Sequence, residues 1–217
     1  MAETPQQLPR TLWIGIVLLL VVLCMAYALS LMELNRAHQR ALPVLSPIAG
    51  FTLMNQDGRP TTLADLSNHV WIADIIFTRC TNTCPIMSQQ MKSLQDALPP
   101  TSRAKLVTLT TDPDFDTPPV MKNYGERFAD FNRWMFLTGT KAEIAGLAGD
   151  SLKLSAVPVK PEDRRNDADL FIHSTIFVVV DQHARLRGVF ETQGDGVNWT
   201  NVQPRLITTV RQLERER

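Results

Sequence analysis

Three short apolar runs stand out along the chain, at Val70–Phe77, Ala104–Thr110 and Thr175–Val180. They are rich in β-branched residues and mostly lack the alternation of polar and apolar positions that a half-exposed strand shows. Each run therefore predicts a strand that is buried on both faces. Segments with a helical pattern lie between the runs. Strands that alternate with helices predict an α/β sandwich around a central sheet.

Turn and cap signals predict the remaining elements. Asp57-Gly58 is typical of a hairpin turn, and Pro85 and Pro118 stand where the first residue of a helix is expected. The elements expected on these grounds are a hairpin over 51–63, helices over 85–98, 118–128, 141–147 and 204–217, strands over 134–137 and 186–191, and an inserted loop over 153–169.

An uncharged and overwhelmingly apolar segment, Thr11–Met32, precedes all of these elements. As a helix it rises about 1.5 Å per residue, which is enough to cross a bilayer core of roughly 30 Å. We expect an uncleaved transmembrane anchor; the alternative is a secretory signal peptide cut after Ala28, because Ala26-Tyr27-Ala28 fits the small-residue pattern. The predicted organisation is an N-terminal tail (1–10), the anchor (11–32), a linker (33–47) and one soluble domain (48–217).

Few charges flank the apolar segment. Arg10 precedes it, while Arg36 and Arg40 follow it. Because cytoplasmic flanks carry the excess of basic residues, this distribution gives no support for an outward-facing soluble domain. The side of the membrane on which that domain lies has to be predicted on other grounds.

Composition limits what the soluble domain can do. The 217-residue chain has a formal net charge of zero, so nothing in it indicates nucleic-acid binding. Of its three cysteines, Cys24 lies in the apolar segment, where we expect it to act as a small hydrophobic residue. Cys80 and Cys84 lie so close together that they do not form a disulfide framework for the fold, and their function is predicted to be local.

Cys80 and Cys84 directly follow the first buried strand and precede a predicted helix. Both thiols are therefore expected at a strand-to-helix corner. Backbone N–H groups and the helix dipole favour the thiolate form at such a corner. A thiolate is both the nucleophile of disulfide exchange and a soft metal ligand, so the two functions remain open at this point.

Four segments carry a resemblance to a known family: FTRCTNTCPIM, TTDPDFDTPPVMKNYGERF, WMFLTG and FIHSTIFVVVDQHARLRGVF. In order and spacing they resemble the SCO/SenC family, over roughly residues 51–213. The combination of three motifs is far more specific than any one of them: C-x3-C-P, then D-P-x-x-D-T-P, then a downstream H-S-T. One departure is Thr81, where many members have proline, but the ligand types and their spacing are intact.

The resemblance implies a membrane-anchored protein of thioredoxin-like fold that delivers copper to the binuclear copper site of cytochrome c oxidase. It implies that Cys80, Cys84 and His173 bind copper, as Cu(I), Cu(II) or both. It also implies that the soluble domain is extracytoplasmic, on the periplasmic side of a bacterial inner membrane, and that the copper-binding oxidase subunit is its partner. Because copper ligation requires reduced thiols, a thiol–disulfide reductase is a further expected partner.

The residue types permit this chemistry. Two thiolates select Cu(I), and a neutral imidazole completes a three-coordinate site, whereas structural zinc would require a fourth protein ligand. His173 taken alone is more typical of a satisfied core or surface histidine. In thioredoxin folds a cis-proline lies in the corresponding loop beside the active-site cysteines, but this chain has Ile172-His173-Ser174-Thr175 there. We therefore favour His173 as a ligand.

Other candidate residues have simpler explanations. Asp112 and Asp116 either orient a ligand or hold the loop near the metal, or they serve turn and cap chemistry. Turn and cap chemistry is the expectation for Asp116, and both alternatives stay open for Asp112. Asp74, inside an apolar strand, requires a hydrogen-bond partner. Met87 and Met91, one helical turn apart, are expected in the core rather than on a metal. The histidines expected to be solvated are His38, His69 and His183.

Two hypotheses from different classes follow. The first is a copper chaperone with no catalytic residue, in which a Cys80–Cys84 disulfide would block copper loading. The second is a membrane-tethered thiol–disulfide oxidoreductase for cysteines of an oxidase subunit or another extracytoplasmic protein, with Cys80 attacking and Cys84 resolving. The C-x3-C spacing and the missing cis-proline disfavour the enzyme. A copper or redox sensor is a third alternative, but the sequence contains no evident output domain.

Overall fold

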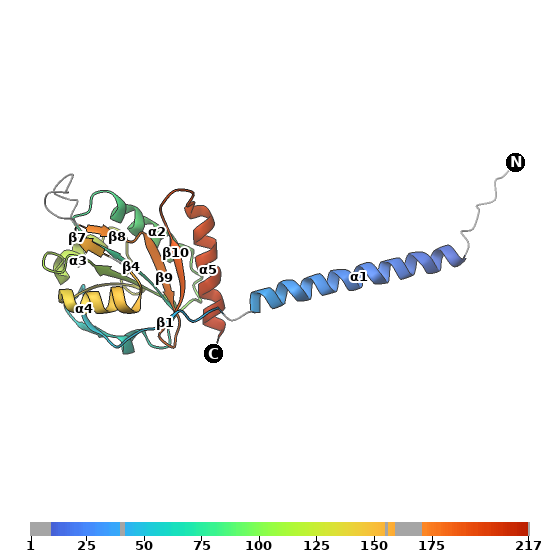
Figure 1. Ribbon diagram of the computed structural model, residues 1–217, viewed down its shortest axis with the longest axis horizontal. Helices are drawn as coiled ribbons and strands as arrows, with labels where there is room; N and C mark the ends of the chain where they lie inside the picture. Colours follow the sequence, from blue (N-terminus) through green and yellow to red (C-terminus); the bar gives the residue numbers. More distant parts are fainter. Residues whose placement is uncertain (1–9, 40–41, 155, 159–170, 217) are drawn as a thin grey trace. The chain divides into compact units, whose positions relative to one another are not determined.

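The computed structural model describes the backbone of residues 10–39, 42–154, 156–158 and 171–216 (Figure 1). The chain divides into two compact units, residues 1–41 and 42–217. Helix α1 (Arg10–Gln39) is the described part of the first unit, and its segment Leu12–Met32 is long and apolar enough to cross a membrane. The helix continues through residues 33–39, the start of the predicted linker, because most of these residues are good helix formers.

The second unit is built on a mixed β-sheet. The strands of this sheet are β1 (Ser46–Pro47), β2 (Thr52–Asn55), β3 (Pro60–Thr62), β4 (Trp71–Ile76), β5 (Lys105–Thr110), β6 (Trp134–Thr138), β9 (Ile176–Val180) and β10 (Arg185–Glu191). They lie in the order β1-β10-β9-β4-β5-β6-β2-β3. β4, β5 and β6 are parallel to one another, while β9 runs antiparallel to β4. A separate two-stranded ribbon pairs β7 (Ala156–Pro158) with β8 (Phe171–His173).

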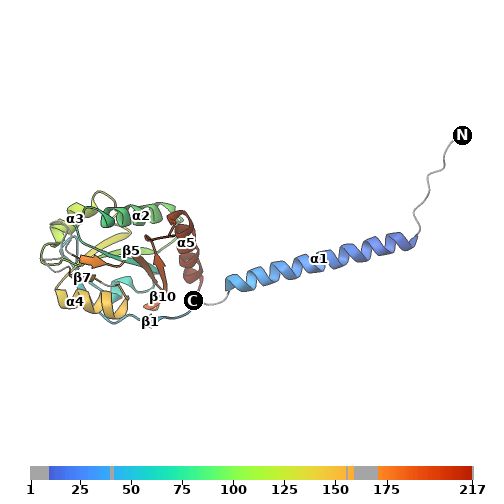
Figure 2. The ribbon, with the colours of Figure 1, turned by 45° about the horizontal axis from the view of Figure 1, so that its top comes forward.

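Helices cover both faces of the sheet (Figure 2). The elements on the first face are α2 (Thr83–Ala97), α3 (Pro118–Gly125) and α5 (Trp199–Arg215). Those on the second face are the 3-10 turn η1 (Leu63–Leu66), α4 (Lys141–Ala145) and the π-helical turn η2 (Gly146–Ser151). One apolar core lies under each layer, so the central strands are buried from both sides, as their predominantly apolar runs predict.

The strand predictions are confirmed, and so is the α/β sandwich. Every residue of β4 is buried, and β5 and β9 lie on either side of it. The predicted hairpin is formed by β2 and β3, with Gly58 at φ +71° in its turn, a conformation that glycine adopts without strain. β7 lies inside the predicted inserted loop; residue 155 and residues 159–170 of that loop lie outside the described residues.

Two predicted helix starts are wrong by a few residues. α2 begins at Thr83 rather than Pro85, because proline is also tolerated at the third position, where its missing N–H would have no acceptor within the helix. α5 begins at Trp199 rather than Pro204. The Asn198 side chain accepts the Thr200 N–H at 2.9 Å, and this cap sets the start of the helix ahead of the proline.

Candidate metal centre

Cys80 and Cys84 lie where β4 passes into α2. Both are thiols rather than a disulfide, and Cys80 is half-buried while Cys84 is fully buried in the first turn of α2. The backbone N–H of Cys84 donates to Cys80 Sγ at 3.4 Å. A donor of this kind stabilises negative charge on the outer sulfur, as expected at a helix N-terminus. The accessible sulfur is therefore the one that accepts a backbone N–H at the helix N-terminus.

The inner sulfur has a different environment. Burial raises the pKa of the Cys84 thiol, and its hydrogen bond with Cys80 and the charge of Cys80 raise that pKa further. Cys84 therefore keeps its proton in the metal-free protein. A bound metal cation reverses this preference, because coordination deprotonates a thiol. Metal binding at this corner would thus release a proton from Cys84.

The loop after β5 holds the residues just before Cys80. Asp116 is fully buried and accepts the Thr78 N–H at 3.1 Å, together with the hydroxyl groups of Thr78 and Thr110. Burial raises the pKa of Asp116, an effect that these hydrogen bonds oppose. The prediction that Asp116 serves turn and cap chemistry is therefore wrong: its carboxylate connects the β5 loop to the thiol loop.

A second contact joins the same two loops. The Nε atom of Arg79 donates to Asp112 Oδ2 at 3.2 Å, and the guanidinium carbon lies 4.3 Å from the centre of the Phe115 ring. Arg79 is adjacent to Cys80 in the chain, so Asp112 positions the thiol loop through it. Arg79 is a positioning residue that was not predicted from the sequence. The signal that could have indicated it is an arginine beside a cysteine, with acidic residues after the next parallel strand.

The segment that contains His173 lies at the same edge of the sheet as the thiols. Because β9 is antiparallel to β4, with Ala73 opposite Val178, the start of β9 lies at the edge where β4 ends. His173 is the last residue of β8, shortly before β9, and pairs with Ala156 in the ribbon. Its side chain lies outside the described residues. Among the side chains that are described, no group of three or more Cys, His, Asp or Glu residues is arranged to hold a metal ion.

Hydrogen bonds connect the chain after His173 to the start of α2. The backbone carbonyl of Thr175 accepts the Thr192 N–H at 2.8 Å. Gln193, the next residue, donates from Nε2 to the Thr83 carbonyl at 3.3 Å. Thr83 immediately precedes Cys84 in the chain. The backbone two residues beyond His173 is thus tied, through the end of β10, to the corner that carries the thiols.

The other buried residues considered from the sequence, Asp74, Met87 and Met91, lie in the interior of the second unit. Thr108 Oγ1 donates to Asp74 Oδ1 at 2.6 Å and accepts the Trp134 Nε1–H at 2.9 Å, which supplies the partner that Asp74 requires. Met87 and Met91 are fully buried in the core under α2, which confirms their predicted packing role.

The described histidines outside the candidate centre lie away from the thiols. His69 precedes β4, at the end of that strand opposite Cys80, and its Nδ1 atom lies 2.9 Å from the Ser67 carbonyl oxygen. His183 is exposed in the turn between β9 and β10, as predicted. The side chain of His38 lies outside the described residues. Neither His69 nor His183 is therefore a candidate ligand for a metal at the thiol corner.

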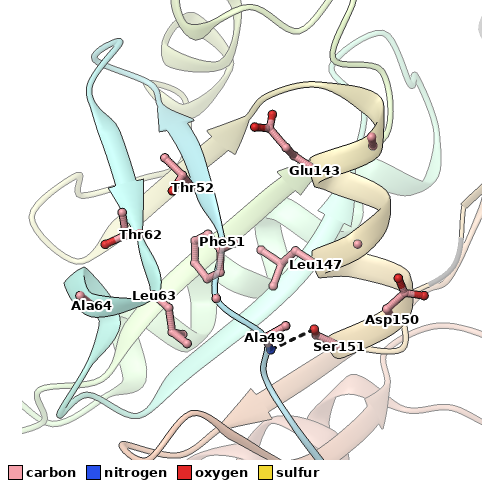
Figure 3. Close-up of a pocket in the computed structure, with 13 residues that line it drawn as sticks. Ala49, Phe51, Thr52, Thr62, Leu63, Ala64, Glu143, Leu147, Asp150 and Ser151 are labelled. Carbon is pink, nitrogen blue, oxygen red and sulfur yellow. Dashed lines mark hydrogen bonds between the residues drawn. The ribbon is translucent and has the colours of Figure 1, made fainter.

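A groove of about 710 Å³ lies on the other face of the sheet (Figure 3). Phe51 and Leu147 lie at its centre, and Ser151 Oγ accepts the Ala49 N–H at 3.2 Å at its edge. Its lining contains no cysteine or histidine. Cys84 packs into the core of the opposite face, so this groove is separate from the candidate metal centre.

Comparison with known proteins identifies the family. The sequence model that describes the SCO1/SenC family matches residues 44–205, which make up most of the second unit. The chain belongs to the SCO1/SenC family. A curated relative, the SCO1 protein homolog of Bacillus subtilis, is 33% identical over 162 residues, which cover 71% of this chain and 81% of the relative.

Solved structures of Sco proteins share the fold. One of them is BsSco, which is described as a member of the Sco family of cytochrome c oxidase assembly proteins with a disulfide switch. It superposes with a TM-score of 0.67 and is 26% identical in sequence; the match covers 82% of this chain and 100% of BsSco. Copper-bound ScoI from Bradyrhizobium japonicum gives a TM-score of 0.64, and the match covers 77% of this chain and 99% of ScoI. At 21% identity this match shows that the two proteins share a fold. These SCO1/SenC structures confirm the predicted thioredoxin-like fold.

Proposed function

We propose that this SCO1/SenC protein is a membrane-anchored copper chaperone, with Cys80, Cys84 and His173 as ligands and the copper-binding subunit of cytochrome c oxidase as acceptor. The observation that carries the proposal is the pair of reduced thiols at the β4–α2 corner, at the sheet edge from which the His173 segment also runs. Bradyrhizobium japonicum ScoI, a protein of the same fold, is described with copper bound.

The donor set fits copper better than structural zinc. Two thiolates and one imidazole suit Cu(I), and a fourth protein ligand, which structural zinc normally takes, is not available from the described Cys, His, Asp and Glu side chains. A three-coordinate site leaves room for an incoming ligand of the acceptor before one of its own ligands leaves. Such a site favours transfer over permanent storage.

The second candidate function is thiol–disulfide exchange. One observation favours it: Cys80 is the accessible sulfur and accepts an N–H bond, while Cys84 is buried and retains its proton. This is the division of roles between an attacking and a resolving thiol. A Cys80–Cys84 disulfide would also remove both sulfur ligands, so exchange with a reductase would control copper loading.

We further propose that α1 anchors the protein in the membrane and that the second unit lies on the extracytoplasmic, periplasmic side. The support is the apolar span Leu12–Met32 and the family to which the chain belongs. The periplasm is an oxidising compartment, in which Cys80 and Cys84 would form a disulfide. A reductase partner is therefore needed on that side to keep both thiols reduced for copper loading.

Copper loading tests the first function. The reduced full-length protein in detergent is loaded with copper, freed of excess metal and titrated with a competing Cu(I) chelator. We expect one copper per chain in the wild type and a loss of affinity of at least tenfold in His173→Ala, because one of three ligands is removed. His69→Ala is the matched control, since His69 lies at the opposite end of β4 and should leave loading unchanged.

The outcomes separate the two functions. Equal copper retention in His173→Ala and His69→Ala would contradict the assignment of His173. A protein that holds no copper in the reduced state but exchanges disulfides with a thiol substrate would be an oxidoreductase. Loading of the oxidised protein supplies a second readout: we expect none until a reductant is added, and full loading of the disulfide form would rule out ligation by both sulfurs.

A further inference from the structure

A cleft of about 620 Å³ opens directly beside the thiol loop. Two of its lining residues, Thr78 and Arg79, immediately precede Cys80. The rest come from the loop after β5 and from the α3 region: Phe115, Pro119, Val120, Asn123, Tyr124 and Arg127. A molecule seated in this cleft would therefore contact the two residues that directly precede Cys80 in the chain.

The cleft presents positive charge and aromatic surface together. Its lining contains two arginines and no carboxylate. Two carboxylates contact lining residues from outside the lining: Asp112 is paired with Arg79 and has 10% of its side chain exposed, and the fully buried Asp116 accepts hydrogen bonds from Thr78. Arg127 forms none of the ion pairs of the described residues. Among the described residues, no carboxylate is paired with this cation at the side of the cleft.

Both guanidinium groups are held in place by aromatic rings. Arg79 lies over Phe115, and the guanidinium carbon of Arg127 lies 4.4 Å from the centre of the Tyr124 ring and 5.2 Å from that of Phe128. The Tyr124 hydroxyl is hydrogen-bonded to Ser88 of α2 at 2.8 Å, which fixes this ring against the thiol-bearing helix. A cation fixed in this way loses little conformational entropy when a carboxylate binds it.

Apolar side chains are exposed in the cleft and on the first turn of α2. Phe115 is 43% exposed although it is a large aromatic side chain, and Ile86, in the first turn of α2, is 44% exposed. Arginine and aromatic residues are the types that most often dominate binding energy in protein interfaces. Exposed apolar side chains beside a reactive site indicate a surface that a partner covers.

We propose that this cleft docks an acidic segment, with an apolar side chain next to its carboxylates, of the protein that exchanges copper with Cys80 and Cys84. The proposal rests on the proposed chaperone function and adds the surface and the chemistry by which the acceptor is recognised. Its basis is charge complementarity: Arg127 receives a carboxylate, while Phe115 covers the apolar side chain. The docked segment would hold the acceptor ligands beside the outer sulfur.

Binding kinetics test the proposal. The full chain in lipid nanodiscs, loaded with Cu(I), is titrated with the purified, reduced and metal-free copper-binding domain of the cytochrome c oxidase subunit from the same organism. We expect Arg127→Glu to weaken binding at least tenfold, mainly through slower association, and to remove most of the ionic-strength dependence. Phe115→Ser should weaken binding by roughly threefold or more while the ionic-strength dependence remains.

The matched control is Arg205→Glu. Arg205 is also an exposed arginine over an aromatic ring, 5.9 Å from the centre of Phe190, but it lies on α5. Its charge change equals that of Arg127→Glu, so it reports the effect of net charge alone. Copper stoichiometry and the thermal midpoint, measured on each variant, show that the folded, loaded protein is being compared.

Each outcome decides one proposal. Equal weakening by Arg127→Glu and Arg205→Glu would overturn the docking surface and leave the chaperone function intact. A wild type that holds no copper but binds the domain with the expected charge dependence would overturn the chaperone function and leave the surface intact. If Arg127→Glu instead dissolves a dimer of the wild-type chain, the occupant is a second copy, and the acidic acceptor segment is wrong.

Discussion

At the scale of single residues, the thiol loop depends on one buried carboxylate. Asp116 accepts hydrogen bonds from Thr78, by backbone and side chain, and from Thr110. Its removal leaves these donors without their acceptor, and the Thr110 hydroxyl is fully buried, where an unsatisfied donor is costly. The position of Cys80, two residues beyond Thr78, therefore depends on a residue that is far from it in the sequence.

We expect Asp116→Ala to lower the free energy of unfolding by about 3 kcal/mol. Urea denaturation of the full-length protein in detergent measures this change, and faster amide exchange at Thr78 should accompany it. Asp114→Ala is the control two residues away, because Asp114 is 71% exposed and pairs with Lys141 at the surface. Similar effects of the two substitutions would contradict the anchoring role of Asp116.

At the scale of elements, the seating of α3 on the sheet depends on the lack of a side chain at Gly125. A Cβ atom there would lie 2.8 Å from a ring carbon of Phe131 and 2.9 Å from one of Phe136. Phe136 is fully buried and stacks against Trp134, so its ring cannot withdraw without disturbing β6. α3 carries Tyr124, and its displacement would also alter the cleft beside the thiols.

Gly125→Ala should therefore lower the free energy of unfolding by roughly 1–3 kcal/mol, the usual effect of overpacking. Thermal unfolding followed by circular dichroism measures it. The matched control is Gly149→Ala in η2, where an added Cβ meets nothing within 4 Å. That variant should be neutral or slightly more stable, because alanine restricts the unfolded chain. Destabilisation of both variants to the same extent would show that close packing at Gly125 is not the cause.

At the scale of the whole second unit, one buried arginine joins its beginning to its end. Arg187 is 4% exposed, donates to Asp181 at 2.6 Å and to Glu216 at 2.7 Å, and donates to the Leu42 carbonyl at 2.6 Å. It thus ties the first residue of the unit and its last helix to the β9–β10 turn. These contacts lie at the end of β9 opposite the thiol corner, so the network acts on stability rather than on the candidate centre.

We expect Arg187→Met to destabilise the protein by about 3 kcal/mol at neutral pH, because the buried Asp181 then keeps only Arg185 as a cationic partner. Denaturant unfolding at several pH values measures this change. The double variant Asp181→Leu with Arg187→Met should be less destabilised than the single one, since it removes both charges. A double variant that is less stable than the single variant would contradict this explanation.

The same network predicts a pH dependence. Burial by itself would raise the pKa of Asp181, but hydrogen bonds from Arg185 and Arg187 outweigh it and hold this pKa below its usual value. A carboxyl group with a lowered pKa in the folded state stabilises the protein above its unfolded pKa of about 4. This contribution is lost as the pH falls through the folded pKa. The stability difference between wild type and Arg187→Met should therefore shrink below about pH 4, and a constant difference would contradict it.

Local sequence patterns were sufficient for the strands and for the two cysteines. β4, β5 and β9 follow from predominantly apolar runs, because a strand buried on both faces carries few polar residues. The β2–β3 turn follows from Asp57-Gly58, and the strand-to-helix corner from the run that ends before Cys80. The helix starts were less accurate, because more than one nearby residue could cap or begin each helix.

By itself, the sequence determined the fold class, the apolar span and the thiol pair, since each depends on residues that are neighbours in the chain. Only the tertiary structure decided what Asp116, Arg79 and Arg187 do, because their partners lie on other elements and no local pattern selects one buried partner among many. The cleft beside Cys80 also arises from this non-local packing: Thr78, Phe115 and Arg127 meet only after β4, β5 and α3 are assembled on one sheet.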